Sequence, residues 1–224
     1  SGYEELSLLS LSSADYTRIK DLISKLASEY GPQGVAVSLP SLRVDSFSIA
    51  LARDVEKSRR TGLTFAPEAG TQRMRDIINK GVTEDDLMAA ATDAFESGWD
   101  QIKLYFMIGL PFETLEDIDG IAALSRRVLQ LGRQVAGARG KAGRARVNVS
   151  VSSFVPKPHT PFQWFPQNTR EQLVQKQSYL KDRMRVRGLS ASFHDVWASH
   201  LEAAFARGDR RLAPVIERAR DLGC

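Results

Sequence analysis

Two oppositely charged side chains, Glu68 and Lys80, are the clearest candidates for chemistry in this sequence. They lie in the stretch GLTFAPEAGTQRMRDIINKG, residues 62–81. Its pattern predicts a short buried strand, a polar turn that carries Glu68, and a helix that ends before Lys80. The helix dipole alone favours a carboxylate at the start of such a helix and an ammonium at its end. A strand, a turn and a helix also make a βα unit, and such units bind ligands at the carboxyl ends of their strands.

The rest of the chain repeats this strand-then-helix pattern. Apolar runs predict strands at residues 35–39, 63–66 and 101–109, and alternation of apolar with polar residues predicts strands at 6–11 and 147–154. One further strand candidate lies at residues 189–193. Amphipathic patterns predict helices at residues 14–30, 47–59, 71–79, 167–187, 196–206 and 210–222, and two more that begin after Thr83 and at Thr114. At the first of these two starts, Thr83 and Asp86 have the spacing of a capping box. Between them, the Gly/Ala/Arg-rich segment 132–146 is expected to be a flexible loop.

This alternation predicts an α/β fold with a parallel sheet and right-handed connections. The run QIKLYFMIG at residues 101–109 is apolar enough for a strand covered on both faces. Five clear units are too few for a closed eight-unit barrel, which takes about 250 residues. We therefore expect a partial β/α barrel over residues 1–165 and a helical C-terminal extension over residues 166–224.

The strand ends of such a barrel would bring a polar set of residues to one rim. The set is rich in hydroxyls, prolines and turn glycines, and it includes Ser10, Ser12, Arg43, Glu68, Gly109 and the segment 152–159. No His, Asp or Glu spacing in the chain indicates a metal site, and no phosphate-binding glycine motif is present. The rim therefore predicts binding of a polar organic molecule and not hydrolysis.

Composition narrows the class of protein further. The only cysteine is Cys224, which excludes disulfides and a cysteine-ligated cluster within the chain. No apolar run approaches the roughly 20 residues that span a bilayer, and residues 1–10 do not resemble a secretory signal. We expect a cytoplasmic protein that does not contact membranes.

Three motifs together resemble the radical S-adenosylmethionine (SAM) superfamily. They are GLTFAPEAGTQRMRDIINKG, IKLYFMIGLPFET and VSVSSFVPKPHTPFQW, which follow one another on successive predicted strands. The chain is most similar to the branch that has an upstream cobalamin-binding-type domain. The resemblance implies a partial barrel of six strands, of which this chain would supply about five. It also implies a Cys-x3-Cys-x2-Cys loop for a [4Fe-4S] cluster, and this chain lacks that loop.

The resemblance assigns SAM contacts to both ends of the opening stretch. It places Glu68 on the ribose hydroxyls and Lys80 on the methionine carboxylate. A carboxylate accepts from hydroxyls and an ammonium pairs with a carboxylate, so the residue types suit these roles. Ser10 and Ser12 match the place where the family binds the methionyl amine, although the usual Gly-Gly-Glu is absent there.

The resemblance assigns the adenine contacts to two later strands. Met107, Ile108 and Gly109 match the segment whose backbone lies against adenine. Ser152 and Val155 match the strand end that closes the adenine pocket. Arg43 and His159 are candidates for substrate contact, although His159 also suits a rigid turn.

These assignments predict the C-terminal part of a radical SAM enzyme. In the complete protein, SAM would be cleaved reductively to a deoxyadenosyl radical, with cobalamin as a further candidate cofactor. The expected partner is the protein's own N-terminal half, and this chain alone should be inactive. A barrel without its first strand would expose an edge at residues 6–11, which predicts dimerisation there or coverage by the tail.

Two other functions remain open from the sequence. Seven basic and no acidic residues lie within residues 126–146, a pattern that fits an RNA-binding module or an RNA substrate. A solvated helix end explains the same charges. A β/α-barrel enzyme without a cluster is the second alternative, and it would be active without iron.

Overall fold

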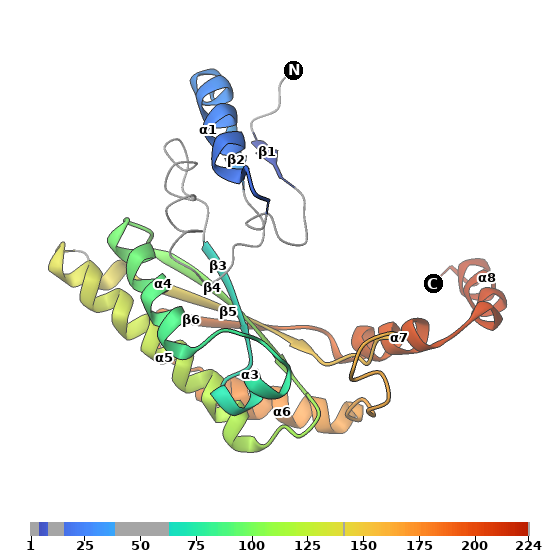
Figure 1. Ribbon diagram of the computed structural model, residues 1–224. Helices are drawn as coiled ribbons and strands as arrows, with labels where there is room; N and C mark the ends of the chain where they lie inside the picture. Colours follow the sequence, from blue (N-terminus) through green and yellow to red (C-terminus); the bar gives the residue numbers. More distant parts are fainter. Residues whose placement is uncertain (1–4, 9–15, 39–62, 141, 224) are drawn as a thin grey trace.

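The computed structural model describes residues 5–8, 16–38, 63–140 and 142–223 (Figure 1). The predicted helix at residues 47–59 lies outside this described part, as do residues 9–15. Within it, no helix has the length and apolar character needed to cross a membrane.

A four-stranded parallel sheet forms the centre of the molecule. Its strands are β3 (Leu63–Glu68), β4 (Gln101–Ile108), β5 (Arg146–Ser153) and β6 (Leu189–Phe193), in the order β3-β4-β5-β6. The α/β class with parallel strands is confirmed. The boundary predicted at residue 165 stays a prediction; β6 lies beyond it and is the sheet's fourth strand.

Two further strands pair separately. The strands β1 (Glu5–Ser7) and β2 (Ala36–Ser38) are parallel, with Leu6 opposite Val37. Between them in sequence lies α1 (Ile19–Tyr30), whose Ile19 and Ile23 are buried against Leu6 and Leu8. The helix was predicted from residue 14, but residues 16–18 are not helical.

Three helices cover one face of the four-stranded sheet (Figure 1). They are α4 (Glu84–Glu96), α5 (Leu115–Ala138) and α6 (Arg170–Arg183). On β4, Ile102, Leu104, Phe106 and Ile108 point to this face and are at most 1% exposed. Of the alternate residues of β4, Gln101 is exposed, and Lys103, Tyr105 and Met107 are only half-buried. Coverage on both faces was therefore a wrong expectation, and the second face of the sheet is partly open.

The helix α5 is longer than the sequence predicts. The expected loop at residues 132–146 is helical to Ala138 and then forms a 3-10 turn, η3 (Ala142–Arg144). Gly132 does not break the helix, because it makes room for a neighbour. A Cβ at Gly132 would lie 2.5 Å from Cζ of the buried Phe95 in α4. Tertiary packing thus accounts for a glycine that the sequence pattern attributed to a loop.

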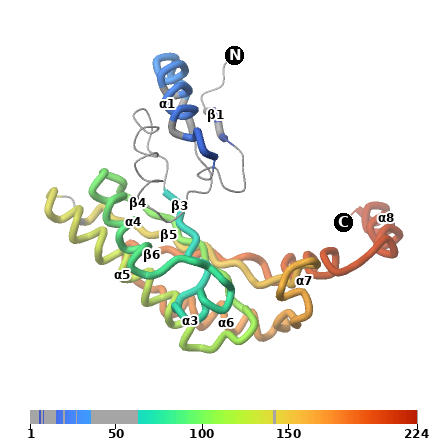
Figure 2. The backbone as a smooth tube through the Cα atoms, viewed as in Figure 1, coloured from blue at the N-terminus to red at the C-terminus, as the bar shows by residue number. Residues whose placement is uncertain are grey.

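The C-terminal elements leave the sheet as an extended arm. After β6 come α7 (Val196–Arg207), η4 (Arg210–Leu212) and α8 (Ala213–Asp221), and Figure 2 shows them projecting away from the strands. The helix α6 is shorter than the predicted 167–187, because Thr169 caps its start and it ends at Arg183.

The capping box of α4 is confirmed and supports a stability prediction. The Thr83 hydroxyl accepts a hydrogen bond from the Asp86 N–H, and the Asp86 carboxylate accepts one from the Thr83 N–H at 2.8 Å. Thr83→Ala should lower the free energy of unfolding by about 1 kcal/mol, measured by urea denaturation. Thr83→Ser keeps the hydroxyl and should unfold like the unmodified chain; an equal loss in both variants would contradict the capping role.

Candidate functional site

A pocket of about 460 Å³ lies at the carboxyl ends of the central strands. Of the predicted cofactor residues, it brings together Glu68 from β3, Met107 from β4, and Ser152 and Val155 from the end of β5. The remainder of its lining is Ile78, Leu110, Ser153, Phe154, Lys157, Thr160, Phe162, His194, Ser199 and Glu202. The predicted rim therefore exists, and much of its lining is apolar.

Glu68 is held in an unusual backbone conformation at the end of β3. The strand extends through Glu68 and not only to Ala66 as predicted, with a register irregularity between Phe65 and Glu68. The N–H of Ala69 then donates to the Pro67 carbonyl at 2.8 Å, which makes a three-residue turn centred on Glu68. Its φ of 66° is rarely adopted by residues other than glycine. Strain of this kind concentrates at functional sites.

Lys80 is brought to Glu68 by the way α3 (Gln72–Ile77) ends. Asn79, with a φ of 54°, reverses the chain, and the N–H of Lys80 donates to the Arg75 carbonyl at 2.8 Å. This is the hydrogen-bonding pattern of a Schellman helix end. The Lys80 ammonium then lies 3.4 Å from Glu68 Oε1, and the two side chains are 33% and 30% exposed. The two charges meet at the pocket edge and remain open to a ligand.

At the end of β4, the alternation of the strand separates the predicted residues. Met107 lines the pocket, whereas Ile108 points to the opposite face and is fully buried among the helices. Gly109 has a φ of 79°, and a Cβ there would lie 3.0 Å from Leu173 of α6. Its N–H donates to Glu113 Oε2 at 2.9 Å, and Lys176 of α6 donates to the same oxygen at 2.6 Å. Burial raises the pKa of Glu113, and the hydrogen bond from Lys176 opposes that rise.

The remaining predicted residues lie outside the pocket or outside the described part of the chain. His159 is exposed in a turn with a φ of 62°, where its N–H donates to Gln163 Oε1 at 3.1 Å, and it does not line the pocket. Ser10, Ser12 and Arg43 lie outside the described residues.

Sequence reasoning missed the wall that β6 and α7 contribute. His194 follows β6 and lines the pocket, with its N–H bonded to the Val151 carbonyl at 2.9 Å. Its neighbour Asp195 caps α7 by accepting from the Ala198 N–H at 2.8 Å. Glu202 of α7 pairs with Lys157 from the segment after β5. The signal in the sequence was the strand candidate at residues 189–193. Had it been assigned to the same parallel sheet, His194 would have been placed at this rim.

A chain of phenylalanines borders the pocket. Phe154 and Phe162 both line it, and their ring centroids are 6.2 Å apart. Phe162 contacts Phe165 at 5.5 Å, and Phe165 contacts Phe112 at 5.2 Å, all edge to face. Phe112 is 62% exposed. The border thus offers aromatic surface beside the charged pair.

Most arginines of the basic segment at residues 126–146 form hydrogen bonds or ion pairs with other residues of the chain. Arg126 and Arg133 donate to carbonyls of Arg183 and Arg187, and Arg139 donates to carbonyls of Phe95 and Glu96. In the same segment, Arg127 pairs with Glu84 and Arg144 lies 4.0 Å from Asp100. These contacts favour a structural role, and RNA binding through this segment stays a prediction.

No metal site is evident in the described part of the chain, where no three His, Cys, Asp or Glu side chains are grouped as ligands. The cluster ligands that a radical SAM enzyme needs would have to be thiolates, and the sequence has a single cysteine.

Comparison with curated proteins finds one relative whose match covers nearly all of this chain. The uncharacterized protein MJ0966 of Methanocaldococcus jannaschii is 29% identical over 219 residues, which are 97% of this chain and 44% of that protein. The chain thus spans less than half the length of this relative.

Comparison with solved structures supports the fold. SuiB of Streptococcus suis matches with a TM-score of 0.56 and 12% identity, over 88% of this chain and 41% of SuiB. The structure of SuiB bound to S-adenosylmethionine matches over the same shares at 12% identity, with a TM-score of 0.54. The sequence signature of the Radical SAM superfamily matches residues 1–124. More than half of the chain carries this signature, and the chain belongs to the radical SAM superfamily.

Proposed function

We propose that this chain is the SAM-binding part of a radical SAM enzyme, and that the pocket at its strand ends holds the nucleoside and the carboxylate of SAM. The observation that carries the proposal is the convergence of Glu68, Met107, Ser152 and Val155 on one pocket, with Lys80 beside Glu68. The SAM-bound SuiB structure, which matches this fold, supports the same ligand.

The described residues fit such a ligand. The pocket volume of about 460 Å³ lies within the roughly 300–1,000 Å³ of small-molecule sites. Glu68 offers carboxylate oxygens to the ribose hydroxyls, and Lys80 has donors left for a carboxylate after pairing with Glu68. Met107, Phe154 and Val155 offer apolar surface to a flat base.

The [4Fe-4S] cluster of the superfamily would be held from outside these 224 residues, because their single cysteine cannot supply three thiolates. When bound, the cluster and SAM would supply an electron and a carbon-centred radical for hydrogen abstraction. The residues of this chain would bind SAM, orient it and exclude water from it. Membership of the cobalamin-associated branch and a role for cobalamin stay predictions.

Binding of two nucleosides that need no cluster tests the proposal. S-adenosylhomocysteine carries the amino-acid carboxylate, and methylthioadenosine lacks it. By titration calorimetry, Glu68→Gln should weaken both ligands by about tenfold or more, because a charged acceptor contributes about 1.5–3 kcal/mol. Lys80→Met should weaken only S-adenosylhomocysteine.

Two exposed residues far along the chain serve as matched controls, Glu217→Gln in α8 and Lys181→Met in α6. Both controls should bind like the unmodified chain. If Glu68→Gln and Lys80→Met bound both nucleosides as tightly as the controls do, the roles assigned to Glu68 and Lys80 would be wrong.

A further inference from the structure

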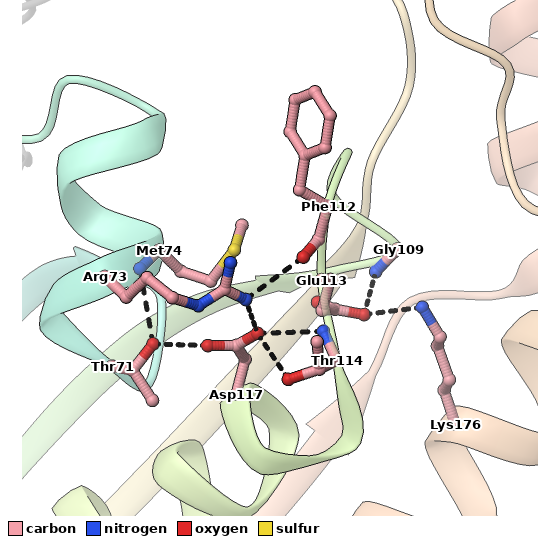
Figure 3. Close-up of polar contacts among 9 residues, drawn as sticks. All are labelled: Thr71, Arg73, Met74, Gly109, Phe112, Glu113, Thr114, Asp117 and Lys176. Carbon is pink, nitrogen blue, oxygen red and sulfur yellow. Dashed lines mark hydrogen bonds and ion pairs between the residues drawn. The ribbon is translucent and has the colours of Figure 1, made fainter.

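Asp117 in the first turn of α5 makes contacts that its role in the helix does not require. It is 3% exposed. As the third residue of a capping box, its Oδ2 accepts from the N–H and the hydroxyl of Thr114, at 2.8 and 2.9 Å. Its carboxylate also accepts from the Thr71 hydroxyl and from Arg73, residues more than forty positions earlier in the chain (Figure 3).

These extra contacts join the two loops that lead out of β3 and β4. Thr71 caps α3 just after the turn that carries Glu68. Thr114 ends the loop that begins with Gly109. Arg73 spans the same gap a second time, because it donates to the Phe112 carbonyl at 3.0 Å as well as to Asp117 (Figure 3).

The backbones of these two regions are in close contact. A Cβ at Gly70 would lie 2.1 Å from the Ile121 nitrogen and 2.4 Å from the Asp117 carbonyl oxygen. A Cβ at Gly120 would lie 2.8 Å from the Thr71 side chain. The β3–α3 turn is therefore packed directly on the backbone of the first turns of α5.

Two strained residues flank this contact. Glu68 and Phe112 each have a φ of 66°. Such a conformation is strained and persists only where the surrounding structure over-determines it. Here, the Asp117 contacts supply that constraint on both loops.

The charge on Asp117 is itself maintained by these donors. Burial acts to raise the pKa of its carboxyl group, but the hydrogen bonds from Thr71, Thr114 and Arg73 outweigh burial and lower the pKa below its ordinary value. Asp117 is therefore an anion at neutral pH, and both of its carboxylate oxygens accept hydrogen bonds.

We propose that Asp117 is a positioning residue for the pocket, which fixes the Glu68 turn against the Gly109–Thr114 loop so that the ribose-side and adenine-side contacts of SAM keep one spacing. The proposal rests on the proposed function, because it assumes that Glu68 and Met107 contact one ligand.

The helix α4 provides a matched control. Asp86 accepts from the Thr83 N–H and hydroxyl at 2.8 and 2.6 Å, so it has the same place in a capping box as Asp117. In the described part of the chain, its hydrogen bonds stay within this cap. Asp117→Asn and Asp86→Asn therefore weaken the same local contact, and only the first also weakens the link between loops.

The test is S-adenosylhomocysteine affinity by calorimetry for the unmodified chain and for Asp117→Asn, Asp86→Asn, Glu68→Gln and Arg73→Met. Asp117→Asn and Arg73→Met should weaken binding about tenfold, the lower end of the effect of losing a supporting partner at metal sites. Asp86→Asn should leave affinity unchanged. Arg73 has a half-exposed side chain, so its variant tests the link even where Asp117→Asn does not fold.

The outcomes separate the two proposals. Absence of binding by the unmodified chain would remove the proposed function and, with it, this inference. Binding that Glu68→Gln weakens, but that Asp117→Asn or a folded Arg73→Met leaves unchanged, would overturn only the positioning role. Equal losses in Asp117→Asn and Asp86→Asn would also overturn it, since they would indicate a general effect of lost capping.

Discussion

Gly70→Ala should destabilise the fold by about 3 kcal/mol, at the upper end of what over-packing usually costs. The added methyl group would meet the Ile121 nitrogen at 2.1 Å and the Asp117 carbonyl oxygen at 2.4 Å. Both are backbone atoms of the 24-residue helix α5, so neither can move away as the end of a flexible side chain would. The change would show as a lower midpoint of urea unfolding followed by circular dichroism.

Gly81→Ala is the control for this prediction. Gly81 lies just beyond α3, and a Cβ there would meet nothing within 4 Å. Its replacement should change stability by no more than the few tenths of a kcal/mol usual for surface substitutions. Similar stability of the two variants would mean that the β3–α3 turn can move away from α5, contrary to the close backbone packing.

Phe65→Ala should cost about 3–5 kcal/mol, the range for truncating a large buried aromatic side chain. Phe65 is fully buried in β3 and belongs to the core formed by the sheet with α4 and α5. Its loss leaves a cavity beneath the strand that ends in Glu68. Urea unfolding measures the stability. The affinity for S-adenosylhomocysteine at low denaturant then reports whether the loss of Phe65 also disturbs the turn that carries Glu68.

The control is Phe205→Ala, because Phe205 lies in α7 and is 45% exposed. Removing the same ring there should cost less than half as much. Comparable losses at the two positions would show that β3 is not part of the main cooperative core.

The proposed site depends on a sheet whose two faces differ. One face is sealed by α4, α5 and α6, so its residues serve packing. The other is partly open and holds Met107, so a ligand can approach the strand ends from that side. The apolar sequence of β4 does not reveal this difference, because Met107 and Ile108 are both apolar and yet point to opposite faces.

The sequence by itself determined the features that depend on near neighbours. The apolar run of β4 identified a buried strand, and the spacing of Thr83 and Asp86 identified a helix start, because both depend on residues within one strand or one turn. The order of strands and helices was enough to predict a parallel sheet. It was also enough to predict that Glu68 and Ser152 would lie at the same rim.

Only the tertiary structure decided the features that depend on distant partners. Gly132 continues a helix because Phe95 lies against it, although the local pattern indicated a loop. His194 reaches the pocket because β6 joins the sheet, and Asp117 links two loops because Thr71 and Arg73 lie beside it. Such contacts join residues more than thirty positions apart, and the local patterns of a single sequence do not indicate which of its distant residues are in contact.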